Sequence, residues 1–274
     1  MVSSSATTSS ESRLADAWAA LRRRGGTALI PYLTAGHPSP AGSLEAIRAA
    51  DELADVLEVG VPFSDPLADG PTIQRATFAA LHHGVGLPQT LELIARAAPA
   101  KPVVVFSYLN PILRYGVARF LRDAGAVGVA GVLLTDLPAG ADPALEEELA
   151  VGPLDLIRLV APTTRPERVA RALTGARGFV YLIARLGVTG ASVRLADDLA
   201  DSVARVRRAT PLPVAVGFGL STPEQAAAVA RLADGVVVGS ALVDRLEREG
   251  TGGARRFLAE LRGAIDRVEK PRAA

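Results

Sequence analysis

Eight short apolar runs recur along the 274-residue chain, and a stretch with helical periodicity follows most of them. The runs are rich in Val, Ile and Leu and nearly continuous in apolar character, which is typical of parallel strands buried on both faces. They span residues 27–36, 55–62, 102–108, 131–136, 154–162, 178–184, 212–219 and 234–241. We therefore expect eight parallel β-strands.

Helix-start signals lie between these runs. The segment 221–233 begins with Ser221 or Thr222 as a cap and has Pro223 in its first turn, and the segment 164–176 repeats that design. Alternation of strands and helices indicates an α/β fold, and eight strands favour a (β/α)8 TIM barrel with extra helices. A doubly wound open sheet is the alternative.

The chain carries no linker-like change of composition after its first residues. Residues 1–13 are rich in Ser and Thr, and we expect a disordered N-terminal tail there. Residues 14–270 are then expected to form a single barrel domain, since such barrels commonly need roughly 250 residues.

The second apolar run contains an acid, Glu58, near its end. Three apolar residues share the opposite face of this strand: Leu57, Val59 and Val61. If that face packs against helices, Glu58 points into the barrel, where burial raises the pKa of a carboxyl group and suits it to acid–base chemistry. A solvated glutamate at the strand end is the structural alternative.

A proline-rich loop, residues 62–71, follows this strand and carries Asp65 and Asp69. Loops after barrel strands build active sites, and long ones commonly act as lids or binding loops. Either aspartate could instead be a turn residue, and together they could hold a magnesium ion. Three acids on one strand end and its loop favour a functional interpretation.

Glycine-rich segments follow the last three strands, at 186–190, 217–221 and 238–241. In many barrels the loops after strands seven and eight bind phosphate through backbone N–H groups, together with the start of a short extra helix. Ser240 could donate its hydroxyl and open such a helix over 240–249. We expect a phosphate monoester whose other end reaches Glu58 and Asp69.

Charge and composition exclude several classes of function. The formal net charge is +1, which argues against nucleic acid or a membrane surface as the main partner. Cysteine is absent, and no apolar run approaches the roughly 18 residues of a membrane helix. The first residues lack the apolar centre of a signal peptide, so we expect a soluble, cytoplasmic protein.

Missing residue types narrow the chemistry further. The only lysines are Lys101, expected at the opposite end of the barrel, and Lys270, near the C-terminus, so neither suits Schiff-base chemistry. Three histidines and no cysteine make a zinc site unexpected, and we predict no metal site. Cofactor-free acid–base catalysis on a phosphorylated small molecule is the simplest remaining chemistry.

The segment LEVGVPFSDPLADGPTIQ, residues 57–74, closely resembles the signature of the tryptophan synthase alpha subunit family. Similarity extends over about residues 27–262, through PYLTAG (31–36), YLIARLGVTG (181–190), GFGLSTPEQ (217–225) and VGSALV (238–243). The resemblance implies a barrel lyase of tryptophan biosynthesis. Its reaction is the retro-aldol cleavage of indole-3-glycerol phosphate to indole and glyceraldehyde 3-phosphate.

The same resemblance implies roles for individual residues. Glu58 is similar to the family's general acid–base, Asp69 to the carboxylate that accepts the indole N–H, and Tyr181 to a tyrosine near the reacting centre. Phosphate-binding positions are matched by Gly190, Gly219, Gly239 and Ser240. Indole-pocket positions are matched by Tyr32, Tyr108, Leu133 and Thr135, each of which, like Tyr181, could instead be core packing.

The resemblance also implies a partner, a beta subunit that carries pyridoxal phosphate and assembles as alpha2beta2, while this chain needs no cofactor. Asp65, Arg185 and Thr189 would belong to the lids that respond to that partner. Ala184 and Leu186 depart from the family pattern beside the second lid, which puts its closure in doubt.

Three alternatives stay open. The first is a free-standing indole-producing lyase of specialised metabolism. The second is a weakly catalytic ligand-binding subunit that activates its partner. The third is an isomerase acting on another sugar phosphate.

Overall fold

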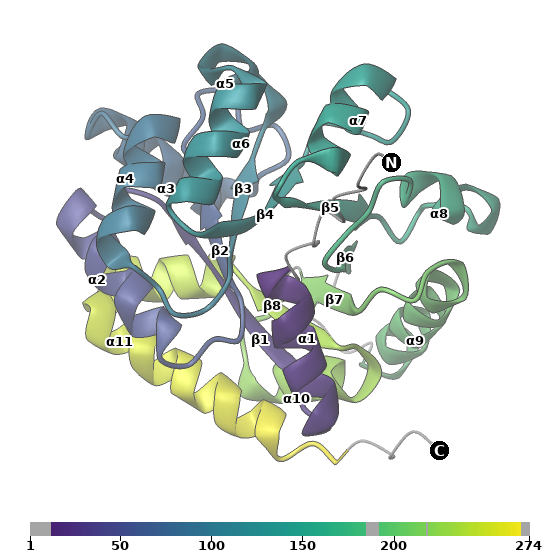
Figure 1. Ribbon diagram of the computed structural model, residues 1–274. Coiled ribbons are helices and arrows are strands. Elements are labelled where there is room, and N and C mark those ends of the chain that lie inside the picture. Colours follow the sequence, from purple (N-terminus) through teal and green to yellow (C-terminus); the bar gives the residue numbers. More distant parts are fainter. Residues whose placement is uncertain (1–11, 185–191, 218, 270–274) are drawn as a thin grey trace, which may run out of the picture.

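Eight parallel strands form a closed barrel in the computed structural model, which describes residues 12–184, 192–217 and 219–269, apart from the side chains of 192–197 (Figure 1). The strands are β1 (Ala28–Thr34), β2 (Leu57–Gly60), β3 (Val103–Ser107), β4 (Val129–Leu134), β5 (Asp155–Val160), β6 (Val180–Ile183), β7 (Val214–Gly217) and β8 (Gly235–Val238). They neighbour one another in chain order, and β8 pairs with β1. This closure confirms the TIM barrel and excludes the open sheet.

Helices surround the barrel on its outer side (Figure 1). They are α1 (Arg13–Arg23), α2 (Pro40–Asp51), α3 (Pro71–His82), α4 (Leu87–Ala97), α5 (Leu109–Tyr115), α6 (Val117–Ala126), α7 (Pro143–Val151), α8 (Pro166–Ala172), α9 (Ser192–Ala209), α10 (Pro223–Leu232) and α11 (Ser240–Asp266). Helix α1 begins at Arg13, with Ser12 as its cap, beside the expected domain boundary. The division into a tail and a single domain stays a prediction.

Strand β4 begins two residues earlier than the sequence pattern predicts, at Val129 rather than Gly131. Position 131 lies within the strand, and it is occupied by glycine because there is little space for a side chain. A Cβ atom there would stand 3.0 Å from Leu14 Cδ1 and 3.1 Å from the carbonyl oxygen of Asp155. The glycine marks a crowded point of the sheet and not a strand boundary.

The two predicted helix starts differ from each other. Thr222 caps α10, accepts from the Gln225 N–H at 3.3 Å, and forms a reciprocal capping box with Gln225. At α8 the cap position is Arg165, which makes no side-chain cap, and Thr164 instead accepts from the Ala161 N–H at 3.3 Å. The shared sequence design therefore gives a capped helix in one place only.

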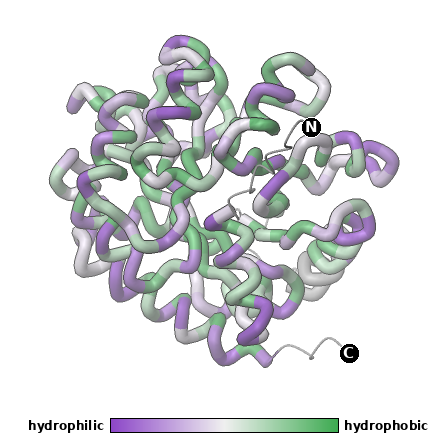
Figure 2. The backbone as a smooth tube through the Cα atoms, viewed as in Figure 1, coloured by the Kyte–Doolittle hydropathy of each residue, from purple (hydrophilic) through white to green (hydrophobic). Residues whose placement is uncertain are grey.

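Two apolar layers hold the barrel together. Outward-facing strand residues pack against the helices, while a separate cluster fills the barrel interior. Helix α1 contributes Leu14, Trp18 and Leu21 to the interior cluster and thereby covers one end of the barrel. The outer helices alternate between hydrophilic and hydrophobic stretches, as expected for segments with one buried face (Figure 2).

Helix α11 closes the structure against β1, α2, α3 and α10. Gly250, with φ of +66°, interrupts it and separates the predicted extra helix 240–249 from a second helical part. Among the helices in the described part of the chain, none has both the length and the apolar character that a membrane span requires.

Candidate active site

Glu58 lies on β2, beside Tyr32 of β1 and Val104 of β3. Its side chain belongs to the inner face of the barrel, because Leu57, Val59 and Val61 all lie in the outer apolar layer. Only 1% of the residue is exposed. The alternation of the sequence therefore predicts the direction of Glu58 correctly, and the solvated alternative is wrong.

The carboxyl group of Glu58 has no hydrogen-bond partner within the described part of the chain. Burial in this apolar position raises its pKa from 4.5 to about 8. A buried carboxyl group that stays protonated near neutral pH is equipped to donate a proton, and neither oxygen is held by a partner among the described residues. Glu58 has the properties of an acid–base catalyst.

Asp69 lies on the loop between β2 and α3, and Tyr108 holds it in place. The Tyr108 hydroxyl donates to Asp69 Oδ2 at 3.1 Å and accepts from the Ala68 N–H at 2.9 Å. Burial raises the pKa of Asp69 to about 6, while the hydrogen bond from Tyr108 acts in the opposite direction. Gln74 supports the same loop by donating to the carbonyl oxygen of Asp69 at 3.0 Å.

Two buried tyrosines stand near Glu58. Burial is the main cause that raises the pKa of both Tyr32 and Tyr181, and the nearby charge of Glu58 adds to it. Each ring lies over a glycine: a Cβ atom on Gly60 would stand 2.1 Å from Tyr32 Oη, and one on Gly217 would stand 2.3 Å from Tyr181 Oη. Because glycine has no Cβ atom, Gly60 and Gly217 leave the space that these two rings occupy.

The other predicted indole-pocket residues divide into two groups. Thr135 is half-buried, and its hydroxyl donates at 3.5 Å to the carbonyl oxygen of Ser107, the residue before Tyr108. Leu133 is fully buried in the interior cluster with Tyr181, where it packs as a core residue. Tyr32, Tyr108 and Tyr181 therefore each lie near one or both acids, and the pocket roles of Thr135 and Leu133 stay predictions.

The predicted phosphate site is described in part. Gly219 has a φ of +73°, a conformation that favours glycine, and Gly239 is the residue before α11. Ser240 begins α11 and is exposed. The first N–H groups of a helix have no partner within it, so this end can receive an anion. Gly190, Arg185, Thr189 and Leu186 lie outside the described residues.

Among the described residues, Asp65 forms no hydrogen bond or ion pair with Glu58 or Asp69. It is exposed on the loop and accepts a hydrogen bond of 2.5 Å from its neighbour Ser64. Within the described ranges, no group of three His, Cys, Asp or Glu side chains converges as metal ligands would. Ala184 is buried in the outer apolar layer at the end of β6.

Sequence reasoning assigned no role to two residues that shape this site. Gln74 holds the acid loop, and Phe106 packs edge-on against Tyr32, with 5.3 Å between ring centroids. Gln74 is the last residue of the segment 57–74, but the residue type alone does not predict its contacts. Phe106 belongs to an apolar run in which nothing distinguishes it from its neighbours.

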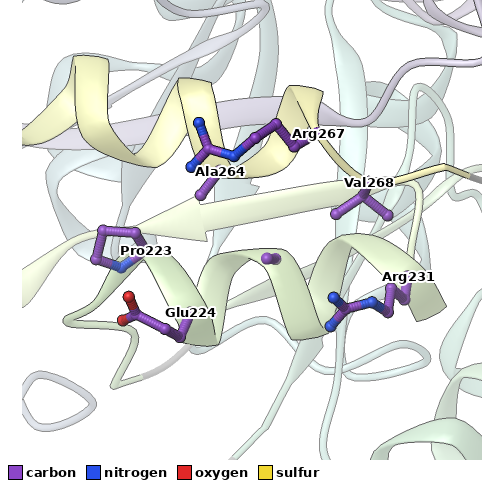
Figure 3. A pocket seen from close by; sticks show the side chains of 7 residues that line it. Pro223, Glu224, Arg231, Ala264, Arg267 and Val268 are labelled. Carbon is purple, nitrogen blue, oxygen red and sulfur yellow. The ribbon is translucent and has the colours of Figure 1, made fainter.

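A separate groove lies on the outer helical layer, between α10 and the end of α11 (Figure 3). Its volume is about 180 Å³, and its charged residues are Glu224, Arg231 and Arg267. Neither the acid pair nor the described part of the glycine loops contributes to its lining.

A (β/α)8 barrel with a buried glutamate on β2 and an aspartate on the loop after it belongs to the class of barrel enzymes, and comparison with known proteins gives the family. The profile of the family Tryptophan synthase alpha chain matches residues 18–269. The tryptophan synthase alpha chain of Chloroflexus aggregans is 46% identical over 264 residues, covering 93% of this chain and 99% of that one. The chain belongs to this family.

Solved structures agree with that assignment. A tryptophan synthase structure from M. tuberculosis, in an aminoacrylate-bound form, has a TM-score of 0.84 and 39% identity, covering 93% of this chain and 99% of that chain. The tryptophan synthase subunit alpha of Legionella pneumophila has a TM-score of 0.85 and 32% identity, covering 94% and 99%. The chain is a lyase of tryptophan biosynthesis that cleaves indole-3-glycerol phosphate.

Proposed function

We propose that Glu58 is the acid–base catalyst of this cleavage and that Asp69 stabilises the reacting ring. The observation that carries the proposal is the complete burial of Glu58 without a hydrogen-bond partner among the described residues. Burial keeps its carboxyl group protonated to about pH 8, so the proton is available at neutral pH.

The reaction begins with transfer of that proton to C3 of the indole ring, which makes the ring an electron sink. The Glu58 carboxylate then takes the proton from the hydroxyl on the adjacent glycerol carbon. The bond between C3 and that carbon breaks, its electron pair returns to the ring, and the carbon becomes the aldehyde of glyceraldehyde 3-phosphate. Asp69 accepts the indole N–H and offsets the positive charge while it exists.

In this proposal the remaining residues bind and orient the substrate. Gly190, Gly219, Gly239 and Ser240 bind the phosphate, and Tyr181 lies beside the reacting carbon. Tyr32, Tyr108 and Thr135 surround the ring. No cofactor in this chain enters any of these steps.

The proposed partner is a beta subunit that carries pyridoxal phosphate, with Asp65, Arg185 and Thr189 in the lids that respond to it. Support comes from the similarity to tryptophan synthase structures and from Leu67, which is 93% exposed at the tip of the acid loop. An apolar side chain so exposed is suited to contact with another protein. Ala184 is the feature that favours the second candidate, a free-standing lyase.

The test is release of indole from indole-3-glycerol phosphate by the purified chain, with and without a beta subunit. Glu58→Gln should lower the rate by about 10²–10⁴-fold, as expected for loss of an acid–base group. Glu92→Gln, on the exposed face of α4, is the matched control and should leave the rate unchanged. Activity of Glu58→Gln equal to that of wild type would overturn the assignment.

The same assay separates the alternatives. A slow rate that rises sharply with the beta subunit indicates the two-subunit enzyme, and a fast rate without it indicates the free-standing lyase. Binding of the substrate without release under either condition indicates a ligand-binding subunit.

A further inference from the structure

A second cavity opens between the loop after β4 and the loop after β5, and it reaches Ile183 at the end of β6. Its volume is about 740 Å³, which is within the range of small-molecule sites. Leu137, Pro138 and Ile183 give it apolar walls. Helices α7 and α8 flank this part of the barrel (Figure 1).

Four arginines line the cavity, namely Arg158, Arg165, Arg168 and Arg171, and its described lining contains no carboxylate. Arg158 is buried and neutralised, because it pairs with Glu146 and donates to the carbonyl oxygens of Thr174 and Leu137. The charge of this wall therefore comes from the three arginines of α8 and its cap.

These three arginines are poorly neutralised. Arg165 lies 3.8 Å from Glu167, and both side chains are exposed, so that pair is weak. For Arg168 and Arg171, the described part of the chain offers no carboxylate within ion-pair distance. Arg171 packs against Gly140 across the cavity, its Nη2 lying 3.2 Å from where a Cβ atom of Gly140 would stand.

We propose that this cavity binds a small organic anion. Its phosphate or carboxylate group would contact Arg168 and Arg171, and its apolar part would lie against Leu137 and Ile183. Guanidinium groups bind both kinds of oxyanion in the same planar geometry. A concave site of this size, with apolar walls and an arginine rim, fits a metabolite better than a flat protein surface.

The site is distinct from the glycine loops proposed for the substrate phosphate. Those loops follow β6, β7 and β8, whereas the cavity lies after β4 and β5, and β4 is opposite β8 in the closed strand order. It does adjoin the candidate active site, because Thr135 lines the cavity and its hydroxyl donates to the carbonyl oxygen of Ser107, the residue before Tyr108. The inference does not depend on the proposed role of Glu58.

The experiment is a titration of the isotope-labelled chain followed by the amide NMR signals of Gly140, Thr163 and Thr164, which lie on the cavity walls. Inorganic phosphate and benzoate are the two probes, added at constant low ionic strength. We expect a saturable shift of these signals with at least one probe. A shift with phosphate alone or with benzoate alone identifies the preferred oxyanion.

The double variant Arg168→Gln/Arg171→Gln should weaken binding at these signals about 10-fold or more, because charge-assisted hydrogen bonds are lost. The signals of Gly239 and Ser240 should keep their wild-type response to phosphate. Arg96→Gln/Arg122→Gln removes the same charge from exposed positions on α4 and α6 and should bind as wild type.

Two results would overturn the proposal. One is the absence of a saturable shift at the cavity walls with either probe. The other is an equal loss of affinity in both double variants, because the weaker binding would then follow from the lower net charge of the protein and not from Arg168 and Arg171. Circular dichroism of each variant checks that α8, where both substituted arginines are exposed, is unchanged.

Discussion

The hydroxyl group of Tyr108 donates a hydrogen bond of 3.1 Å to the carboxylate of Asp69, and the same hydroxyl accepts the Ala68 N–H at 2.9 Å. One side chain at the end of β3 thus fixes both the position and the acidity of an acid on a neighbouring loop. The hydrogen bond stabilises the ionised form of Asp69 and limits the rise in pKa that burial causes.

Tyr108→Phe should therefore raise the pKa of Asp69 above about 6, because burial remains and the stabilising hydrogen bond is lost. The acidic limb of the kcat/KM profile for indole release should move to higher pH. Tyr115→Phe is the control, since that hydroxyl donates at 2.7 Å to Asp123 on the outer helices. If the acidic limb does not move in Tyr108→Phe, the ionisation of Asp69 is not what causes that limb.

The wild-type kcat/KM profile should be bell-shaped. Asp69 must be ionised to accept the indole N–H, so activity should rise as the pH passes about 6. Glu58 must be protonated to donate to the ring, so activity should fall as the pH passes about 8. Activity that keeps rising beyond pH 9 would contradict the acid role of Glu58 in the first step.

Glu58 also links stability to pH. Its pKa rises from 4.5 to about 8 on folding, so its unfavourable ionisation is absent below pH 4.5 and grows as the pH rises towards 8. Glu58→Gln should therefore gain stability relative to wild type over that window, on the order of 5 kcal/mol at most. Urea unfolding of both proteins at pH 5 and pH 9 measures the difference, which Glu92→Gln should not display.

Gly60→Ala should destabilise the barrel, because the added Cβ would stand 2.1 Å from Tyr32 Oη and 2.6 Å from Cζ. Tyr32 is buried against Phe106 and has little room to move, so we expect a loss of about 1–3 kcal/mol. Gly252→Ala is the control, since a Cβ atom there would stand 3.7 Å from Arg256 Nη1, at the flexible end of an arginine side chain. In thermal unfolding, the change in melting temperature relative to wild type should differ in sign or size between the two variants. Equal changes would contradict the steric argument.

The barrel and the direction of Glu58 could be predicted from the sequence because both depend on short-range periodicity. Apolar runs identified the strands, and alternation along β2 separated Glu58 from Leu57 and Val59. The start of β4 was misplaced because Gly131 resembles a boundary residue, although tertiary crowding requires it inside the strand.

The hydrogen bond between Tyr108 and Asp69 could not be predicted in the same way. The two residues are 39 positions apart, and their contact depends on the path of the acid loop. The arginine-lined cavity is likewise a product of the arrangement of α7 and α8, since arginine is common throughout this sequence and no local pattern distinguishes Arg168 or Arg171.

The pairing of β1 with β8 has a consequence for synthesis of the chain. Ala28 pairs with Gly235, so strands separated by roughly 200 residues must meet before the ring is complete, a long-range contact that slows folding. Until β8 has left the ribosome, β1 and β7 each present an unpaired strand edge, which is prone to association with other chains. Nascent chains that stop before Gly235 should therefore depend on chaperones. The barrel can close only when β8 becomes available to pair with β1.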